Sequence, residues 1–314
     1  RRAFRRLQRG RIFKHMTSDF TIDLQHLGRE RFVSSHVFIT DEGPVLLDTG
    51  PGSTIERLES ELGRNGFRLG DLYAIVLSHA HLDHAGATGL VIQANPRAKV
   101  YAHHLAARHL IDPTKLIASA TRVFGDNMER YWGRFLAVPA AQVVTLEGGE
   151  VLTLGNRTFE AIYTPGHAVH HLAYYERAER TVYAGDVGGI RVPSLPVVVP
   201  VTPPPDYDLE LWLRSIEIVR GLGATRLFRT HFGFLDDVEA QLNALVAGLH
   251  AWTDQVVELY RQDLPEPERA DRFDAFVRTW LADRAEPDEI SRFAEFSDFR
   301  ANYYGIARYV AKRG

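Results

Sequence analysis

Cysteine is absent from this chain of 314 residues. Without a thiol the protein has no disulfide, no thiolate metal ligand and no cysteine nucleophile. A metal site would have to use imidazole and carboxylate side chains instead. The absence is compatible with a reducing compartment, and we expect a cytoplasmic location.

Long apolar segments are also missing. A membrane-spanning helix needs about 20 apolar residues. The longest candidate, residues 195–201, is short and contains Pro196 and Pro200. The basic start of the chain is not followed by the hydrophobic segment that a secretory signal requires. We therefore expect neither a membrane span nor a secretory signal.

Charge is spread unevenly along the chain. Seven basic side chains fall within the first 14 residues, and no acidic residue precedes Asp19. With those seven set aside, 30 basic residues remain against 40 acidic ones. Such an acidic body argues against polyanion binding across its surface. We expect a small-molecule substrate rather than nucleic acid as the partner. We interpret residues 1–18 as a basic arm, either native or derived from an upstream sequence.

The apolar pattern predicts two β-rich regions with helices between them. Strand-like segments occur between residues 20 and 102 and again between residues 142 and 184, whereas residues 236–314 show only helical periodicity. This order predicts an α/β protein in which two sheets pack together under helices. We expect a catalytic domain at residues 19–235 and a helical extension at residues 236–314, which either caps a pocket or forms a homodimer face.

Helix boundaries follow from capping residues, glycine and proline. A helix is predicted over residues 85–94, and helical segments over residues 104–136 are predicted to break at Pro113 and Gly125. Another helix is predicted to begin after Asp208 and to end at Gly221. The C-terminal helices are predicted to separate at prolines 265, 267 and 287.

The most informative segment directly follows an apolar strand at residues 72–77. It reads His-Ala-His-Leu-Asp-His and contains His79, His81, Asp83 and His84. Imidazole and carboxylate are ligands that zinc, manganese and iron accept. Three imidazoles and a carboxylate at the end of one strand therefore predict a metal site.

Three further strands in the second half of the chain end in a possible ligand. His167 follows a Thr-Pro-Gly turn, Asp186 follows Tyr-Ala-Gly and His231 follows Phe-Arg-Thr. Any one of these residues alone would more often be an ordinary loop residue. Together with the first motif, they predict that four strand ends supply ligands to one metal centre.

With these motifs the chain resembles the metallo-β-lactamase superfamily over residues 20–235. Asp48, the motif at residues 79–84, His167, Asp186 and His231 match the five family motifs in order. The resemblance implies an αββα sandwich with metals at one edge. It also implies that His79, His81 and His167 hold one metal, that Asp83, His84 and His231 hold a second, and that Asp186 bridges them. Two divalent ions are expected, zinc first, with manganese or iron as alternatives.

The aspartate at position 186 narrows the resemblance. With a carboxylate at the bridging position, the chain resembles glyoxalase II, the lactonases, the transfer-RNA processing nucleases and related esterases. It is less similar to the members that have a cysteine at this position. Residues 164–171 resemble the glyoxalase II stretch, although His170 stands where glycine is usual. The glutathione-binding pattern of glyoxalase II is not found in the C-terminal region.

Five other side chains are candidates for supporting the site or binding substrate. Asp48 would orient a ligand imidazole, and His171 stands at the second histidine of the glyoxalase II stretch. Arg191 could bind a substrate carboxylate, and Tyr207 could donate to a developing oxyanion. His103, at the end of a strand, could lie beside the site.

The function implied is hydrolysis of a carbonyl substrate: a thioester, a lactone or a related ester. A hydroxide bridging the metals would attack the carbonyl, with Asp83, His84 and Asp186 as the central site residues and Asp83 able to accept a proton. One alternative is an iron-dependent oxidoreductase resembling the persulfide dioxygenases. Another is a phosphodiesterase or ribonuclease of the same superfamily.

Overall fold

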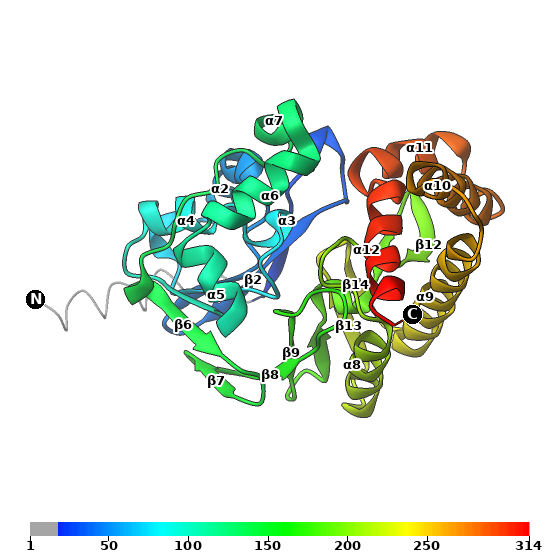
Figure 1. The fold of residues 1–314 in the computed structure, drawn as a ribbon. Coiled ribbons are helices and arrows are strands. Elements are labelled where there is room, and N and C mark those ends of the chain that lie inside the picture. Colours follow the sequence, from blue (N-terminus) through cyan, green and yellow to red (C-terminus); the bar gives the residue numbers. More distant parts are fainter. Residues whose placement is uncertain (1–17, 314) are drawn as a thin grey trace, which may run out of the picture. The chain divides into compact units, whose positions relative to one another are not determined.

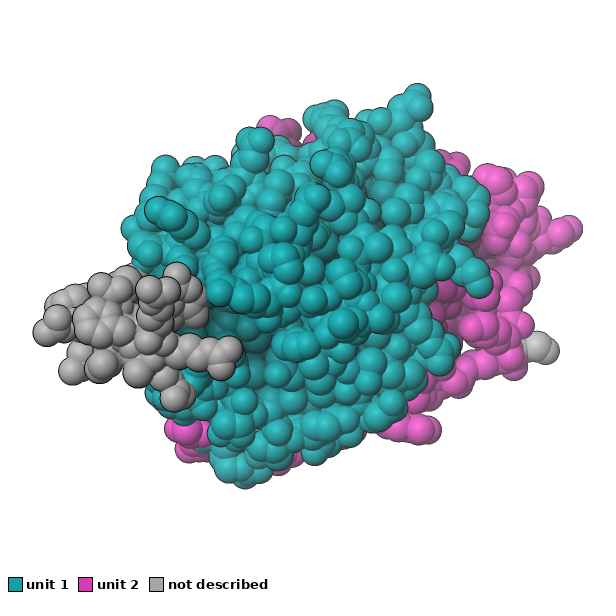
Figure 2. Space-filling view, turned by 90° about the vertical axis from the view of Figure 1, so that its left-hand side faces the viewer, with its two compact units in different colours: residues 1–162, 174–177 teal, residues 163–173, 178–314 magenta. Residues whose placement is uncertain are grey.

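The computed structural model describes residues 18–313 and divides the chain into two compact units (Figures 1 and 2). Unit 1 contains Arg1–Ile162 and Tyr174–Arg177, and unit 2 contains Tyr163–Ala173 and Ala178–Gly314. The basic arm predicted at residues 1–18 lies almost wholly outside the described residues. No helix among residues 18–313 is long and apolar enough to cross a membrane.

Unit 1 is built on a six-stranded sheet with the strand order β1-β2-β3-β4-β5-β6. Strands β1 to β3 pair antiparallel, and β3 to β6 pair parallel. The parallel strand β4 is buried along its whole length, as expected for a strand covered on both faces. The bounds are β1 Phe20–Asp23, β2 Ser34–Thr40, β3 Gly43–Leu47, β4 Ala74–Val76, β5 Lys99–His103 and β6 Val143–Leu146.

Helices connect the parallel strands of unit 1. The connection from β3 to β4 contains α2 (Ile55–Arg64), and the connection from β4 to β5 contains α3 (Leu82–Ala85) and α4 (Thr88–Ala94). Three helices follow β5: α5 His104–Ile111, α6 Thr114–Phe124 and α7 Met128–Trp132. A hairpin of β7 (Val151–Leu154) and β8 (Arg157–Tyr163) comes after β6.

Unit 2 contains three hydrogen-bonded strands, a short hairpin and five α-helices among its described residues. Strand β10 (Thr181–Tyr183) pairs parallel with β13 (Arg226–Arg229), which pairs antiparallel with β14 (Gly233–Leu235). Strands β11 (Ile190–Val192) and β12 (Leu195–Val199) form the hairpin. The short helix η7 spans Gly185–Gly188, and β9 (Leu172–Glu176) crosses the boundary between the units.

The five helices of unit 2 bury a continuous apolar face. Their bounds are α8 Leu209–Gly221, α9 Val238–Tyr260, α10 Glu266–Ala282, α11 Pro287–Phe296 and α12 Phe299–Ala311. Helix α9 contacts α8, α10, α12 and β12 (Figure 1). Trp252 of α9 is fully buried against Phe273 of α10 and Phe299 of α12. The C-terminal part of the chain is therefore helical, as predicted.

Several predicted boundaries are confirmed, and one predicted helix is wrong. Breaks occur at Pro113 and Gly125, and Asp208 caps α8 by accepting a hydrogen bond from the Leu211 amide at 3.0 Å. The helix predicted over residues 85–94 is interrupted at Gly86, where the backbone of Pro51 and Gly52, before α2, would lie 2.9–3.0 Å from an added Cβ atom. The proline-rich segment contains β12, a strand that was not predicted, and Pro196 is not among the residues that pair across its hairpin.

Candidate metal centre

Four predicted ligands lie in the loop and the single helical turn that follow β4. The strand ends at Val76, and His79 lies in the loop. His81 is the N-cap residue of α3, whose turn contains Asp83 and His84. The side chains of His79 and His84 are fully buried, whereas that of Asp83 is 13% exposed. Unit 1 therefore gathers one compact set of ligand side chains.

Asp48 holds this set from the end of β3. Its carboxylate accepts hydrogen bonds from the Ser78 amide at 2.8 Å, the Ser78 hydroxyl at 2.8 Å and His84 Nδ1 at 2.8 Å. Because a carboxylate only accepts, Nδ1 carries the proton and Nε2 is the nitrogen available to a metal. Asp48 has a φ of +51°, a left-handed conformation that costs energy outside glycine. The predicted role of Asp48 in orienting a ligand imidazole agrees with these contacts.

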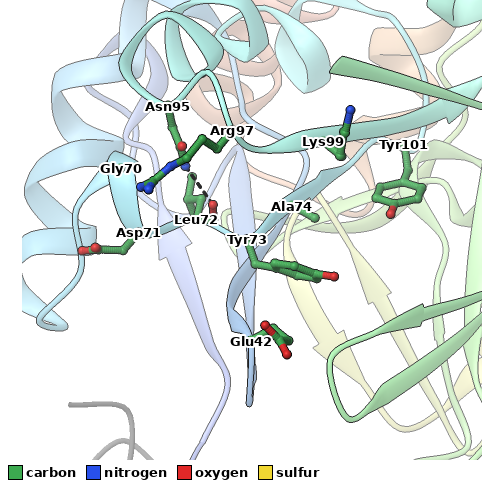
Figure 3. A pocket seen from close by; sticks show the side chains of 10 residues that line it. All are labelled: Glu42, Gly70, Asp71, Leu72, Tyr73, Ala74, Asn95, Arg97, Lys99 and Tyr101. Carbon is green, nitrogen blue, oxygen red and sulfur yellow. Dashed lines mark hydrogen bonds between the residues drawn. The ribbon is translucent and has the colours of Figure 1, made fainter. Parts of the chain in front are cut away.

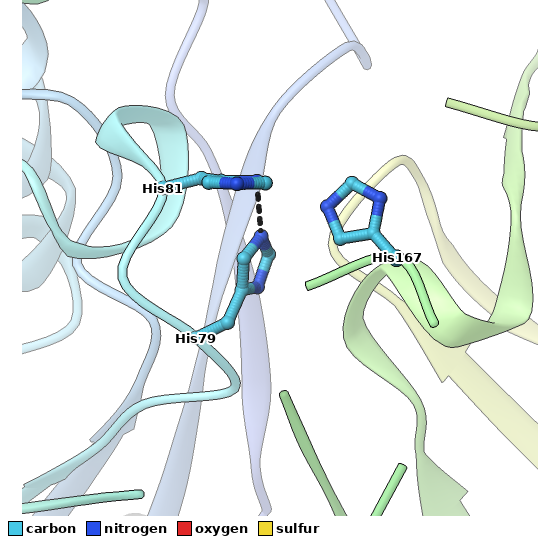
Figure 4. Close-up of side chains that lie close together, drawn as sticks. All are labelled: His79, His81 and His167. Carbon is cyan, nitrogen blue, oxygen red and sulfur yellow. Dashed lines mark hydrogen bonds between the residues drawn. The ribbon is translucent and has the colours of Figure 1, made fainter. Parts of the chain in front are cut away.

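His79 and His81 face each other through their ring nitrogens. His79 Nε2 lies 2.9 Å from His81 Nδ1 (Figure 4), and His79 Nδ1 lies 3.1 Å from the Ser78 hydroxyl. Nitrogen ligands sit about 2 Å from zinc, so two ligands of one ion are about 3 Å apart. The separation of the two nitrogens therefore fits two ligands of one metal ion.

The other three predicted ligands come from three loops of unit 2. His167, also drawn in Figure 4, follows β8, Asp186 lies in η7 after β10, and His231 follows β13. Asp186 Oδ2 lies 3.5 Å from His167 Nε2, and Asp186 Oδ1 lies 3.6 Å from His231 Nε2. All three side chains are buried. The two oxygens of one carboxylate thus face two different histidines, which is the arrangement that a bridging ligand needs.

The ring of His167 is held on two sides. Its Nδ1 donates to the Val201 carbonyl at 2.7 Å, which leaves Nε2 toward Asp186. Trp212 of α8 contacts the ring at 5.4 Å between centroids, and its indole N–H donates to the Val187 carbonyl at 3.1 Å. Gly166 is required at this approach, because a Cβ atom there would lie 2.3 Å from the Trp212 backbone.

His171 supports the segment that contains Asp186. Its Nε2 accepts the Asp186 amide at 3.1 Å, so its Nδ1 carries the proton that it donates to the Thr164 hydroxyl at 2.8 Å. The predicted supporting role of His171 is compatible with this placement, since it fixes the backbone at the bridging residue.

Arg229 supports the segment that contains His231. Its guanidinium is buried and donates to the carbonyls of Arg191 at 3.2 Å and Phe232 at 3.1 Å. The Arg191 amide in turn donates to the His231 carbonyl at 2.9 Å. Burial, and then the charge of Arg191, lowers the pKa of Arg229 to about 10. A buried cation thus joins β11 to the loop of His231.

Arg191 and Tyr207 were predicted to bind substrate, and the structure places one on the surface and the other in the core. The side chain of Arg191 is exposed, and the structure uses its backbone. Tyr207 is buried, and its hydroxyl hydrogen-bonds to that of Thr253 on α9 at 2.7 Å; burial raises the pKa of this phenol. The substrate-binding roles of Arg191 and Tyr207 stay predictions.

His103 is the N-cap residue of α5. Its Nδ1 accepts the Leu105 amide at 3.3 Å, and the neighbouring His104 lies 2.8 Å from Glu147. Burial, followed by the charge of His104, lowers the pKa of His103 to about 4. His103 is therefore neutral at pH 7, and its predicted place beside the site stays a prediction.

A small cavity of about 180 Å³ lies elsewhere in unit 1 (Figure 3). It is lined by Tyr73, Tyr101, Arg97 and Lys99 among others. Lys99 begins β5, whereas the ligands follow the opposite, C-terminal end of the parallel strand β4. None of the predicted ligands lines this cavity.

Three supporting residues were not found from the sequence: Ser78, Trp212 and Arg229. Ser78 could have been suspected, because it directly precedes the motif. Trp212 follows a helical apolar pattern and reads as a core residue. Arg229 donates to backbone carbonyls, and such contacts leave no pattern of side-chain types to recognise.

The model of the metallo-β-lactamase superfamily matches residues 28–231. The chain belongs to this superfamily. A metallo-β-lactamase fold-containing protein of Sulfurisphaera tokodaii is 29% identical over 229 residues, 68% of this chain and 83% of that protein. A hydroxyacylglutathione hydrolase of Francisella tularensis subsp. novicida is 23% identical over 224 residues, 68% of this chain and 72% of the relative.

The fold is also that of the superfamily. A metallo-β-lactamase family protein of Thermus thermophilus has a similar structure, with a TM-score of 0.68, 23% identity and coverage of 90% of this chain and 89% of the other. The predicted fold class, with its helical C-terminal extension, is confirmed. Members of this superfamily are generally hydrolases, and the His/Asp clusters are of the kind that binds metal.

The residues present fit such a metal. The donor set is imidazole and carboxylate, which suits zinc, manganese and iron. In two of the histidines, His84 and His167, a hydrogen bond from Nδ1 to an oxygen leaves Nε2 as the ligand atom. Such outer partners fix the tautomer and the ring orientation of metal-bound histidine.

Proposed function

We propose that the protein is a dinuclear metallohydrolase acting on a carbonyl substrate, namely a thioester, a lactone or a related ester. In this proposal, His79, His81 and His167 hold one metal ion, Asp83, His84 and His231 hold the second, and Asp186 bridges the two. Zinc is the first candidate metal, with manganese and iron as alternatives.

The observation that carries the proposal is the orientation of Asp186. Its two carboxylate oxygens face His167 Nε2 and His231 Nε2, which belong to different metal sites in the proposed assignment. The chain contains no cysteine, so a thiolate cannot take the place of this carboxylate as the bridging ligand. The relative named hydroxyacylglutathione hydrolase supports an acyl substrate, although at 23% identity it does not define which one.

A bound metal pair supplies Lewis acidity and a water whose pKa falls to about 7. The protein residues supply orientation and a place for the proton. Asp48 fixes the Nδ1 proton of His84, and the Val201 carbonyl does the same for His167. Asp83 is the partly exposed carboxylate of the set, and we assign to it the acceptance of a proton during the reaction.

The proposal is tested by hydrolysis rates of the metal-loaded protein on three substrates: a lactoyl-glutathione thioester, a simple lactone and an aryl phosphodiester. We expect turnover of the thioester or the lactone, and its loss in His81→Ala. His250→Ala is the matched control, because His250 is an exposed histidine of α9. Metal content measured on both variants shows whether lost activity follows lost metal.

The outcomes separate the alternatives. Turnover of the phosphodiester alone would contradict acyl hydrolysis and place the protein among the nucleases. No turnover, together with one iron per chain and sulfur-dependent oxygen uptake, would replace the proposal with an iron-dependent oxidoreductase. Retention of two metals and full activity in Asp186→Ala would exclude the bridging role.

A further inference from the structure

We propose that the C-terminal helix α12 is a positioning element for the metal ligand His167. The inference rests on the proposed metal-binding role of His167, and it concerns a helix that lies outside the segment that matches the family model. Its starting point is the segment of residues 200–203, which connects β12 to the turn before α8. Within this segment, the Val201 carbonyl accepts the proton of His167 Nδ1 at 2.7 Å.

The residue after this carbonyl is bound to α12. The Thr202 amide donates to Asn302 Oδ1 at 2.5 Å, and the Thr202 hydroxyl donates to the Asn302 carbonyl at 3.2 Å. Thr202 is fully buried and Asn302 is 2% exposed. In a buried environment a polar contact of this kind is costly to lose, because no water replaces it. One side chain of α12 therefore fixes the backbone next to the carbonyl that orients His167.

The amide of Asn302 is itself held in one orientation. Its Nδ2 donates to the Ser297 hydroxyl at 3.1 Å and to the Asp298 carbonyl at 3.0 Å, both at the start of α12. These two contacts direct Oδ1 toward Thr202. The helix start, the asparagine and the segment thus form one continuous hydrogen-bonded path to the imidazole.

Gly305 allows the helix to approach this segment. It lies three residues after Asn302, so both residues are on one face of α12. A Cβ atom at position 305 would lie 1.8 Å from the Thr202 carbonyl oxygen and 2.9 Å from Pro203. The helical backbone at Gly305 would accept any residue, so space alone requires the glycine. Asn302 and Gly305, on the same face of α12, thus both contact the segment of residues 200–203.

Ordinary packing would not need this arrangement. The other buried face of α12 packs through side chains, as in the contact of Tyr303 with Phe273 of α10, with ring centroids 6.1 Å apart. Asn302 instead binds the main chain of the segment, and that main chain binds His167. A substitution at Asn302 should therefore alter the orientation of the His167 imidazole. A substitution at Tyr303 should alter only the packing of α12.

The experiment compares Asn302→Ala and Gly305→Ala with two controls on the same helix. Tyr303→Leu weakens the packing of α12 without touching Thr202, and Arg308→Ala changes an exposed residue. The first readout is the ¹⁵N–¹H spectrum of the histidine rings in metal-free protein, in which the His167 Nδ1 proton is assigned from His167→Gln. The second is the affinity for Co²⁺, followed by its visible spectrum in competition with a chelator.

We expect Asn302→Ala and Gly305→Ala to lose or shift the His167 Nδ1 signal and to weaken the first bound metal about 10- to 100-fold, the usual cost of losing an outer partner. Arg308→Ala should match the unmodified protein in both readouts. Tyr303→Leu should lower the melting temperature and leave the ring signal and the affinity in place.

The two possible failures are distinct. If the unmodified protein binds metal but Asn302→Ala and Gly305→Ala behave like Tyr303→Leu in both readouts, the positioning role of α12 is wrong. If the unmodified protein binds no metal, the proposed function fails. The metal-free spectrum then still decides whether α12 orients His167.

Discussion

The two sets of predicted ligands are held in different ways. In unit 1, four ligands fall within six consecutive residues, and their main support, Asp48, ends the neighbouring strand of the same sheet. In unit 2, each predicted ligand comes from a different segment, and the contacts that support it join parts of the chain at least 15 positions apart. The first set is therefore determined by local sequence, whereas the second depends on how unit 2 packs as a whole.

Replacing Asp48 by alanine should have the largest effect on metal affinity and stability, and it tests how the set in unit 1 is held. The change removes the acceptor that orients His84 and leaves the buried Ser78 amide without its partner at 2.8 Å. We expect metal affinity to fall about 10- to 100-fold and the free energy of unfolding to fall by about 1–3 kcal/mol. Chelator competition and denaturant unfolding measure the two quantities.

Asp41→Ala is the matched control for this change, because Asp41 is an exposed residue between β2 and β3. Unchanged affinity in Asp48→Ala would mean that the local motif holds its own ligands without outside support. The contrast between the two sets would then be sharper still.

Replacing Arg229 by methionine tests the support in unit 2. The carbonyls of Arg191 and Phe232 lose their donor, but the unfavourable burial of a cation is removed as well. We therefore expect the affinity for the metal held by His231 to fall about 10-fold, with little change in melting temperature. Metal titration and thermal unfolding of metal-free protein give both values.

Arg226→Met is the control for this variant, since Arg226 lies on the same strand with an exposed side chain. A large loss of stability with unchanged affinity would show that Arg229 holds the fold and not the ligand. The ligands of unit 2 would then depend less on distant support than those contacts indicate.

Replacing His103 by glutamine should have the smallest effect, a change in folding stability that is measurable only at acidic pH. Burial lowers the pKa of His103 to about 4, whereas an unfolded histidine titrates near 6.5. Between these values the unfolded chain binds the extra proton, so stability falls as the pH falls from about 6.5 to about 4. We expect His103→Gln to weaken this dependence.

The measurement is the unfolding midpoint against pH in the presence of a chelator, so that protons do not compete with metal. His250→Gln, an exposed histidine, should leave the pH dependence unchanged. An identical slope in His103→Gln and the unmodified protein would contradict the prediction.

The sequence predicted the elements whose signals are local. Pro113, Gly125 and Asp208 mark helix boundaries because their effects on the backbone are confined to a few residues. The hairpin of β11 and β12 was not predicted, because Pro196 argues against a strand unless its pairing is known. The break at Gly86 was not predicted, because it depends on contact with residues more than 30 positions earlier in the chain.

The same distinction applies to the candidate site. All seven predicted ligands were named from residue types at strand ends, and the structure places them in two sets. Their supports in unit 2 were not predicted, except for His171. Val201 acts through its carbonyl, Arg229 binds carbonyls, and Asn302 lies 135 residues after the histidine that it affects. Side-chain type says little about contacts made with a distant main chain.

The contact between Trp212 and His167 has a practical consequence. Only four tryptophans occur in the chain, and the indole of Trp212 touches the imidazole ring and binds the carbonyl next to Asp186. A change in the charge or ligation of that imidazole therefore alters the surroundings of an intrinsic fluorophore. The emission of Trp212 should act as a built-in optical sensor of the metal centre, readable without any label.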